Sequence, residues 1–278
     1  MAETHLPTLH ARTRGKNRYA YTVRSRRSRG VSVGINLDPQ KTCNFDCVYC
    51  EVIDRRAIAK GTGRPAIAID DVARELAEEL ASHSVRSSAA DPVRDIAFAG
   101  DGEPSTFRGF FPLARALFDV RDEAGFGDVP FVLITNGSGL ARDEMSEAHD
   151  LFASRGGTFW IKLDAGTEGF YKTITRSAIS FERILANLTG AAKRHPVVVQ
   201  AMFLRLNGQP PPRDEIAAWA SRLAAVREAG GRLSLVQVYT VARETMEPGV
   251  SALTKTELED IALSARAAVP GVPVETFV

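Results

Sequence analysis

Cys43-Asn-Phe-Asp-Cys47-Val-Tyr49-Cys50 is the most informative stretch of this sequence, because it holds all three cysteines of the 278-residue chain. Disulfides need an even number of cysteines at separations that allow pairing, whereas the ligands of a metal converge on one site. A tight group of three therefore favours metal ligation. We predict that Cys43, Cys47 and Cys50 bind one metal centre.

The number of available ligands limits the kind of centre. Structural zinc usually takes four side-chain ligands, and the nearest histidines, His10 and His83, each lie 33 residues from the closest cysteine. Clusters of the ferredoxin kind take four thiolates, one more than this chain offers. Three thiolates leave one position open, as catalytic metal centres do. A zinc knot or a set of reactive thiols is the alternative interpretation.

The spacing CxxxCxxC, with the aromatic Tyr49 directly before the last cysteine, resembles the signature of the radical S-adenosylmethionine (SAM) superfamily. This resemblance implies that the three thiolates hold a 4Fe-4S cluster and that SAM chelates the remaining iron. It implies further that the reduced cluster cleaves SAM to a 5′-deoxyadenosyl radical, which abstracts hydrogen from the substrate. The cofactors then carry the hard chemistry, and a one-electron donor such as flavodoxin or ferredoxin is required.

The residues that flank the cysteines narrow the resemblance. Gly34-Ile-Asn-Leu-Asp-Pro before Cys43 and Cys50-Glu51-Val after it resemble a group of iron-sulfur oxidoreductases related to the wyosine-type tRNA-modifying radical enzymes. Those enzymes typically carry additional cluster cysteines, which this chain lacks, and glycyl-radical activases match the flanks less well. We expect modification of an unidentified substrate, a small molecule or a tRNA, with no second cysteine-ligated cluster.

Composition and charge agree with a cytoplasmic enzyme. The chain is 44% hydrophobic and 25% charged, which is enough for one α/β barrel domain. It shows neither a run of about eighteen apolar residues nor the apolar core of a secretory signal, so we expect no membrane association. A cluster loop with thiolates also belongs in a reducing compartment.

The first 30 residues form a basic segment, with eight Lys and Arg residues against Glu3 alone. We therefore divide the chain into a basic N-terminal segment, 1–30, and a radical SAM barrel domain, 31–278. The segment either contacts nucleic acid or packs across an acidic face of the barrel. A zinc-stabilised nucleic-acid-binding protein is the alternative from a different functional class.

Short β-rich runs alternate with longer amphipathic helical patterns along the rest of the chain. We predict strands near 31–37, 94–99, 130–135, 158–163, 197–204 and 233–239, and helices from Asp70 and over 112–124, 142–155, 181–194, 213–229 and 254–268. This alternation predicts an α/β fold with parallel strands, a partial (β/α)6 TIM-like barrel, which the resemblance also implies. Active sites in such barrels lie at the carboxyl ends of the strands.

The strand near 94–99 runs into Gly100-Asp-Gly102-Glu103-Pro104. A phosphate-binding loop would need a third glycine, and Glu103 would repel an anion. By resemblance, Gly102 and Glu103 correspond to the GGE-type motif of the superfamily, which hydrogen-bonds the amino group of SAM. Asp101 departs from the usual pattern there.

The next strand ends in Thr135-Asn136-Gly137. Asn-Gly is ordinary turn chemistry. At this barrel position, however, the family commonly supplies a polar group to the ribose or carboxylate of SAM. Thr135 and Asn136 are therefore candidates for SAM binding.

The later strands carry further polar residues. Lys162 and Asp164 lie on the same side of their strand. They would contact the cofactor or the substrate, or pair with each other. Alternation places Gln200 with Met202 and Gln237 with Tyr239 on inward faces, which predicts a polar pocket. We assign catalytic roles to Lys162, Asp164, Tyr239 and Arg243, and SAM-binding roles to Tyr49, Gly102, Glu103, Thr135, Asn136 and Gln200.

Two loops carry cationic residues. Arg243 follows the last predicted strand and would clamp an anionic group of the substrate. The segment 51–69 contains Arg55, Arg56, Lys60 and Arg64. We interpret it as a basic lid beside the cysteines or as a solvated loop.

Overall fold

A curled, mostly parallel sheet is the centre of the molecule. The computed structural model describes residues 17–52, 56–57, 66–86 and 92–278. The sheet has eight strands in the order β1-β2-β5-β6-β7-β8-β10-β12. These strands are β1 (Ala20–Ser25), β2 (Gly30–Ile35), β5 (Val93–Phe98), β6 (Phe131–Thr135), β7 (Thr158–Lys162), β8 (Val197–Met202), β10 (Leu233–Tyr239) and β12 (Val274–Phe277).

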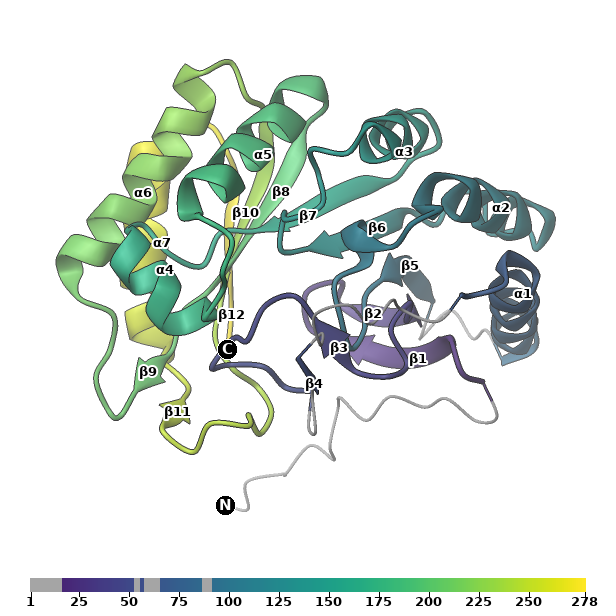
Figure 1. Cartoon of the computed structure of the whole chain (residues 1–278), viewed down its shortest axis with the longest axis horizontal. Coiled ribbons are helices and arrows are strands. Elements are labelled where there is room, and N and C mark those ends of the chain that lie inside the picture. The colour runs from purple at the N-terminus through teal and green to yellow at the C-terminus, as the bar shows by residue number, and fades with distance from the viewer. Residues whose placement is uncertain (1–16, 53–55, 58–65, 87–91) are drawn as a thin grey trace.

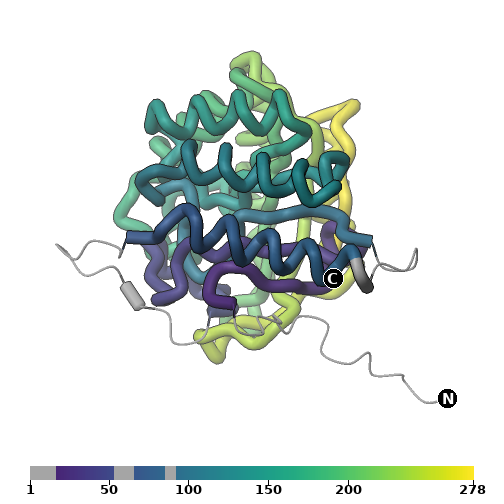
Figure 2. The backbone as a smooth tube through the Cα atoms, turned by 90° about the vertical axis from the view of Figure 1, so that its right-hand side faces the viewer, coloured from purple at the N-terminus to yellow at the C-terminus, as the bar shows by residue number. Residues whose placement is uncertain are grey.

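Helices cover the convex face of this half-barrel (Figure 1). They are α1 (Ile69–Arg86), α2 (Phe110–Glu123), α3 (Asp143–Ser154), α4 (Glu168–Thr175), α5 (Phe181–Arg194), α6 (Arg213–Glu228) and α7 (Lys255–Ala268). Figure 2 shows α1, α2 and α3 side by side in a layer. Capping interactions define where several of these helices begin, as at α7, where Thr254 and Glu257 form a capping box.

The core between sheet and helices is apolar and rich in phenylalanine. Phe98 and Phe131 of the sheet stack with a 5.5 Å centroid distance, and Phe118 of α2 and Phe152 of α3 pack against them. All four side chains are fully buried. Burial of such rings dominates core energetics, so this cluster holds the helices on the sheet.

The predicted α/β partial barrel with parallel strands is confirmed. The six predicted strands correspond to β2, β5, β6, β7, β8 and β10, which pair in parallel, and β12 extends the sheet in parallel. The sequence reading missed β1, β12 and α4. β1 pairs antiparallel with β2 and lies inside the segment that we interpreted as a basic arm. The division of the chain at residue 30 stays a prediction.

One 3-10 turn and four short strands shape the loops at the carboxyl edge of the sheet. They are η1 (Pro104–Thr106, a single 3-10 turn), β3 (Thr42–Cys43) with β4 (Arg56–Ala57), and β9 (Arg205–Leu206) with β11 (Val250–Ser251). Residues 53–55 and 58–65 of the predicted lid lie outside the described residues. In the described part of the chain, no helix has both the length and the apolar character of a membrane span.

Candidate functional site

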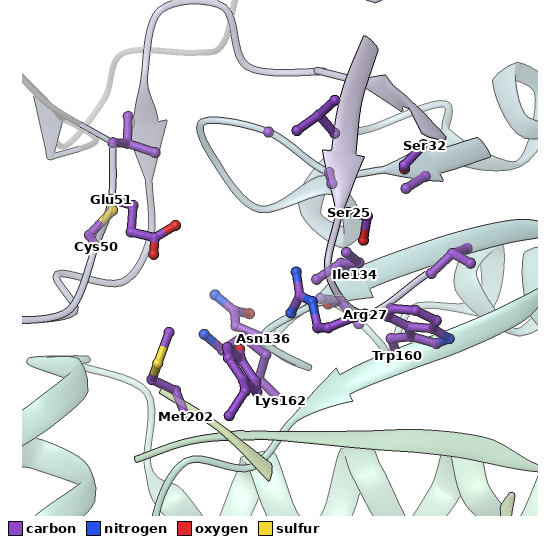
Figure 3. Close-up of a pocket in the computed structure, with 18 of the residues that line it drawn as sticks. Ser25, Arg27, Ser32, Cys50, Glu51, Ile134, Asn136, Trp160, Lys162 and Met202 are labelled. Carbon is purple, nitrogen blue, oxygen red and sulfur yellow. The ribbon is translucent and has the colours of Figure 1, made fainter. Parts of the chain in front are cut away.

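A pocket of about 290 Å³ lies on the concave side of the half-barrel, and residues from distant parts of the chain line it. Figure 3 shows Cys50 and Glu51 on one side of it, with Asn136, Lys162 and Met202 nearby. The predicted site residues that line this pocket are Cys43, Cys47, Tyr49, Cys50, Gly102, Glu103, Thr135, Asn136, Lys162, Tyr239 and Arg243. Asp164 and Gln200 are not among the lining residues.

The loop that carries the cysteines is held by the carboxyl end of α4. The amides of Asp46 and Val48 donate to the carbonyl oxygens of Thr175 and Ile174, each at 2.9 Å. These bonds satisfy carbonyl groups that a helix end leaves without intrahelical partners. The missed helix α4 is therefore part of the scaffold of the site.

The three cysteine side chains are half-buried. Burial raises the pKa of Cys47 to about 12 and also raises the pKa of Cys50, so both are neutral thiols without a metal. Within the described ranges, no three His, Cys, Asp or Glu side chains converge on a single metal ion. A cluster differs from a single ion because each thiolate binds a different iron.

Gly102 joins the second motif to the cysteine loop. A Cβ atom at this position would overlap Asp38 Oδ2 and the backbone oxygen of Thr42. Asp38 Oδ1 in turn accepts a 2.6 Å hydrogen bond from the hydroxyl of Thr42. Only glycine allows the two loops to approach this closely.

The carboxylate of Glu103 is fixed at the wall of the pocket. It is 3% exposed, and it accepts hydrogen bonds from the Thr135 hydroxyl at 2.6 Å, the Asn136 amide at 2.7 Å and the Ser105 amide at 2.9 Å. Charge-assisted bonds of this kind are strong. The structure thus brings together the three residues that we predicted from successive strand ends.

Asn136 also contacts the cysteine loop. Its side-chain amide donates to Asn44 Oδ1 at 3.0 Å, and Asn44 donates to the Ser138 hydroxyl at 2.8 Å. Asn44 directly follows Cys43, so this chain of bonds positions the first cysteine relative to β6. Neither Asn44 nor Ser138 was predicted from the sequence, because Asn44 occupies a variable position of the cysteine motif and Ser138 lies outside any motif.

Tyr49 connects the cysteine loop to β7 and β8. Its hydroxyl donates to Asp164 Oδ2, and Asp164 Oδ1 accepts a 2.8 Å bond from the Met202 amide. Lys162 Nζ lies 3.4 Å from Asp164 Oδ2 and 4.3 Å from the centroid of the Tyr49 ring. The ion pair between Lys162 and Asp164 that we considered is thus present, and a catalytic role for either residue stays a prediction.

Burial and nearby charges both shift the pKa values of Tyr49 and Lys162. Burial, together with the Asp164 carboxylate, raises the pKa of Tyr49 well above its ordinary value. Burial lowers the pKa of Lys162, but Asp164 and Tyr239 oppose this, and the net pKa is raised. Lys162 is therefore a permanent cation at the pocket wall.

The family follows from this arrangement and from the sequence. The model of the radical SAM superfamily matches residues 37–220, about two thirds of the chain. This chain belongs to the radical SAM superfamily. The predicted superfamily and enzyme class are confirmed, and membership implies SAM and an iron-sulfur cluster as cofactors and the need for a reductant.

Solved radical SAM structures share the fold. A radical SAM methyltransferase from Sphaerobacter thermophilus gives a TM-score of 0.61 at 13% identity, with 93% of this chain and 68% of that chain covered. TYW1 with a lysine-pyruvate adduct bound gives 0.53 at 12% identity, with 90% and 84% covered. Identities this low show the fold alone.

A curated relative is similar over most of this chain. The "GTPase Obg" of Brachyspira hyodysenteriae is 26% identical over 235 residues, which cover 83% of this chain and 31% of that protein. The chain thus spans about a third of the length of this relative.

Two predicted residues have partners outside or at the edge of the pocket. Gln200 is fully buried, and its side-chain amide donates to Gln237 Oε1 at 2.7 Å, while the side-chain Oε1 of Gln200 has no partner in the described part of the chain. Arg243 forms a 2.6 Å ion pair with Glu51, which follows the last cysteine. Their assigned roles stay predictions.

Proposed function

We propose that this chain is a radical SAM enzyme with one 4Fe-4S cluster, which cleaves SAM reductively to a 5′-deoxyadenosyl radical that abstracts hydrogen from a substrate. The observation that carries this proposal is that the three cysteines line one pocket together with Glu103, Thr135 and Asn136. When bound, the cluster supplies the electron and SAM supplies the radical. The protein must bind and orient these cofactors and exclude water from the site.

The donor set fits the cluster. Thiolates are the soft ligands that iron-sulfur clusters take, and the three thiols face a shared cavity. Because the pKa values of Cys47 and Cys50 are raised, these two thiols would release protons when the cluster assembles. With only three cysteines in the chain, one iron is left for SAM.

Glu103 and Lys162 offer opposite charges to the methionine part of SAM. Glu103 would accept from the amino group, and its bonds to Thr135 and Asn136 hold the carboxylate in place before SAM arrives. Lys162, held beside Tyr49, would attract the carboxylate of SAM. Asp164 then acts as a positioning residue, through Tyr49 and Met202.

A one-electron donor such as flavodoxin or ferredoxin would reduce the cluster. The substrate is a small molecule or a tRNA, and the resemblance to wyosine-type enzymes favours the tRNA. The small-molecule alternative is supported by the size of the pocket, about 290 Å³, close to the lower limit of ligand sites.

Anaerobic reconstitution tests this function. We expect wild-type protein to take up about four irons per chain and, with dithionite and SAM, to form 5′-deoxyadenosine. Replacement of any cysteine, for example Cys50→Ser, should abolish both. Glu103→Gln is the matched variant, because it should keep the iron but weaken SAM binding about tenfold through loss of a charged acceptor. Iron-loaded wild-type protein that forms no 5′-deoxyadenosine would contradict the proposal.

A further inference from the structure

The turn between β1 and β2 lies across the open side of the half-barrel. β1 and β12 are the two edges of the sheet, and Arg29 in this turn lies 3.3 Å from Glu275 of β12. The guanidinium of Arg27 lies 4.9 Å from the ring centroid of Tyr239 on β10. The turn therefore reaches from one side of the half-barrel to the other.

Two arginines of this turn, Arg26 and Arg27, line the pocket and are half-buried. Figure 3 shows the Arg27 guanidinium in the cavity, beside Ile134 and Trp160 and across from Cys50. Trp160 lines the same pocket, and its buried indole nitrogen has no hydrogen-bond partner among the described residues. Arg26 and Arg27 thus give this wall of the pocket two cationic hydrogen-bond donors.

No ion pair holds either of these two arginines among the described residues. Lys162 pairs with Asp164, and Arg243 pairs with Glu51. Across the part of the chain that the structure describes, neither Arg26 nor Arg27 has a carboxylate within ion-pair distance. Burial and then Arg27 lower the pKa of Arg26, and Arg243 adds to this effect while Glu51 opposes it. Half-buried like charges are costly unless an anion joins them.

A carboxylate that interacts with Arg27, that of Asp95, is already hydrogen-bonded. Asp95 accepts from the Ser32 hydroxyl, and burial raises the pKa of Asp95. The charge of Arg27 opposes this rise in part, so Asp95 balances at most one of the two positive charges.

We propose that Arg26 and Arg27 bind an oxyanion group of the substrate, a phosphate or a carboxylate, and hold it across the pocket from the cysteine loop. Guanidinium groups suit this role because their planar donors match oxyanions in bidentate geometry. The proposal rests on the proposed function in that the cysteine side of the pocket is assigned to the cluster and SAM. The β1–β2 turn is then both the closure of the half-barrel and its substrate clamp.

Calorimetric titration of the anaerobically reconstituted protein tests the clamp. Inorganic phosphate and acetate serve as separate probes, and the tighter probe identifies the kind of oxyanion. Arg26→Gln and Arg27→Gln should each weaken its binding about tenfold, as loss of a charged hydrogen bond does. Arg29→Gln is the matched control, because it removes the same charge from the same turn but outside the pocket, and it should bind like wild type.

A second set of measurements separates this proposal from the proposed function. SAM affinity and 5′-deoxyadenosine formation should stay within about twofold of wild type in Arg27→Gln. Wild-type protein that binds the oxyanion but forms no 5′-deoxyadenosine would overturn the radical function and leave the clamp standing. Equal oxyanion binding by wild type and Arg27→Gln, or no binding by wild type, would overturn the clamp. Loss of SAM affinity with unchanged oxyanion binding would also overturn it, since the arginines would then serve SAM.

A variant that keeps the positive charge at position 27 is a control for misfolding. Arg27→Lys preserves the cation but loses the bidentate fork, so its oxyanion affinity should fall between those of wild type and Arg27→Gln. Affinity equal to that of Arg27→Gln in a folded Arg27→Lys protein would contradict a charge-based site.

Discussion

Tyr49 joins the cysteine loop to the sheet at the wall of the pocket. Its ring lies next to the Lys162 cation, and its hydroxyl bonds to Asp164 in a buried setting. Tyr49→Phe keeps the ring but removes this charge-assisted bond. The free energy of unfolding should therefore fall by about 1–3 kcal/mol.

A double-mutant cycle with Asp164→Asn isolates this bond. Urea unfolding of wild type, both single variants and the double variant should show a coupling of about 1 kcal/mol or more between the two positions. Additive effects would mean that the hydroxyl and the carboxylate do not interact in solution.

A substitution at Gly102 tests the close approach between the loop after β5 and the segment that leads into the cysteine loop. Gly102→Ala forces a methyl group against Asp38 and the Thr42 backbone, so it should cost about 1–3 kcal/mol and reduce iron uptake. Gly169→Ala is the control, because a Cβ atom there meets no atom within 4 Å. Similar stability and iron content for the two variants would contradict the role given to Gly102.

At the scale of elements, α3 is held on β7 by a neutral histidine. His149 is 3% exposed and stacks on Phe159 with a 4.1 Å centroid distance. Burial, with a contribution from His195, lowers the pKa of His149 to about 4. The unfolded chain, with a pKa near 6.5, binds this proton more readily, so stability falls as pH drops below about 6.5.

The expected loss between pH 7 and pH 5 is roughly 2 kcal/mol from this residue. Urea unfolding of the metal-free protein at both pH values measures it. His149→Gln should be less stable than wild type at pH 7 but should lack this share of the pH dependence. An equal loss in both proteins would show that other groups are responsible.

Some of the helices and strands could be predicted from the sequence, and others could not. The strands β2, β5 and β6 could be predicted because each is a buried run of residues that is followed by chemically distinctive residues. The β1–β2 hairpin was missed because its turn lacks the usual glycine or asparagine signal, and Arg29 instead adopts a positive φ of 55°. α4 was missed because it spans only eight residues.

At the scale of the whole molecule, the candidate site was predictable where a motif follows a strand. The contacts that complete it were not, because they join residues far apart in sequence. Asn36 donates to Asp101 across 65 positions, and Asn136 donates to Asn44 across 92. The charge of Arg26 and Arg27 was visible in the sequence, but only the curl of the sheet brings it into the pocket.

The central claim is that the cysteine loop holds a cluster with one iron open to SAM. Electron-nuclear double resonance on the reduced protein measures this directly, with SAM labelled at its amino nitrogen and carboxylate. We predict hyperfine coupling from both labels in wild type, and weaker or absent coupling of the nitrogen in Glu103→Gln. A reduced cluster in wild type that shows no coupling to either label would contradict the account.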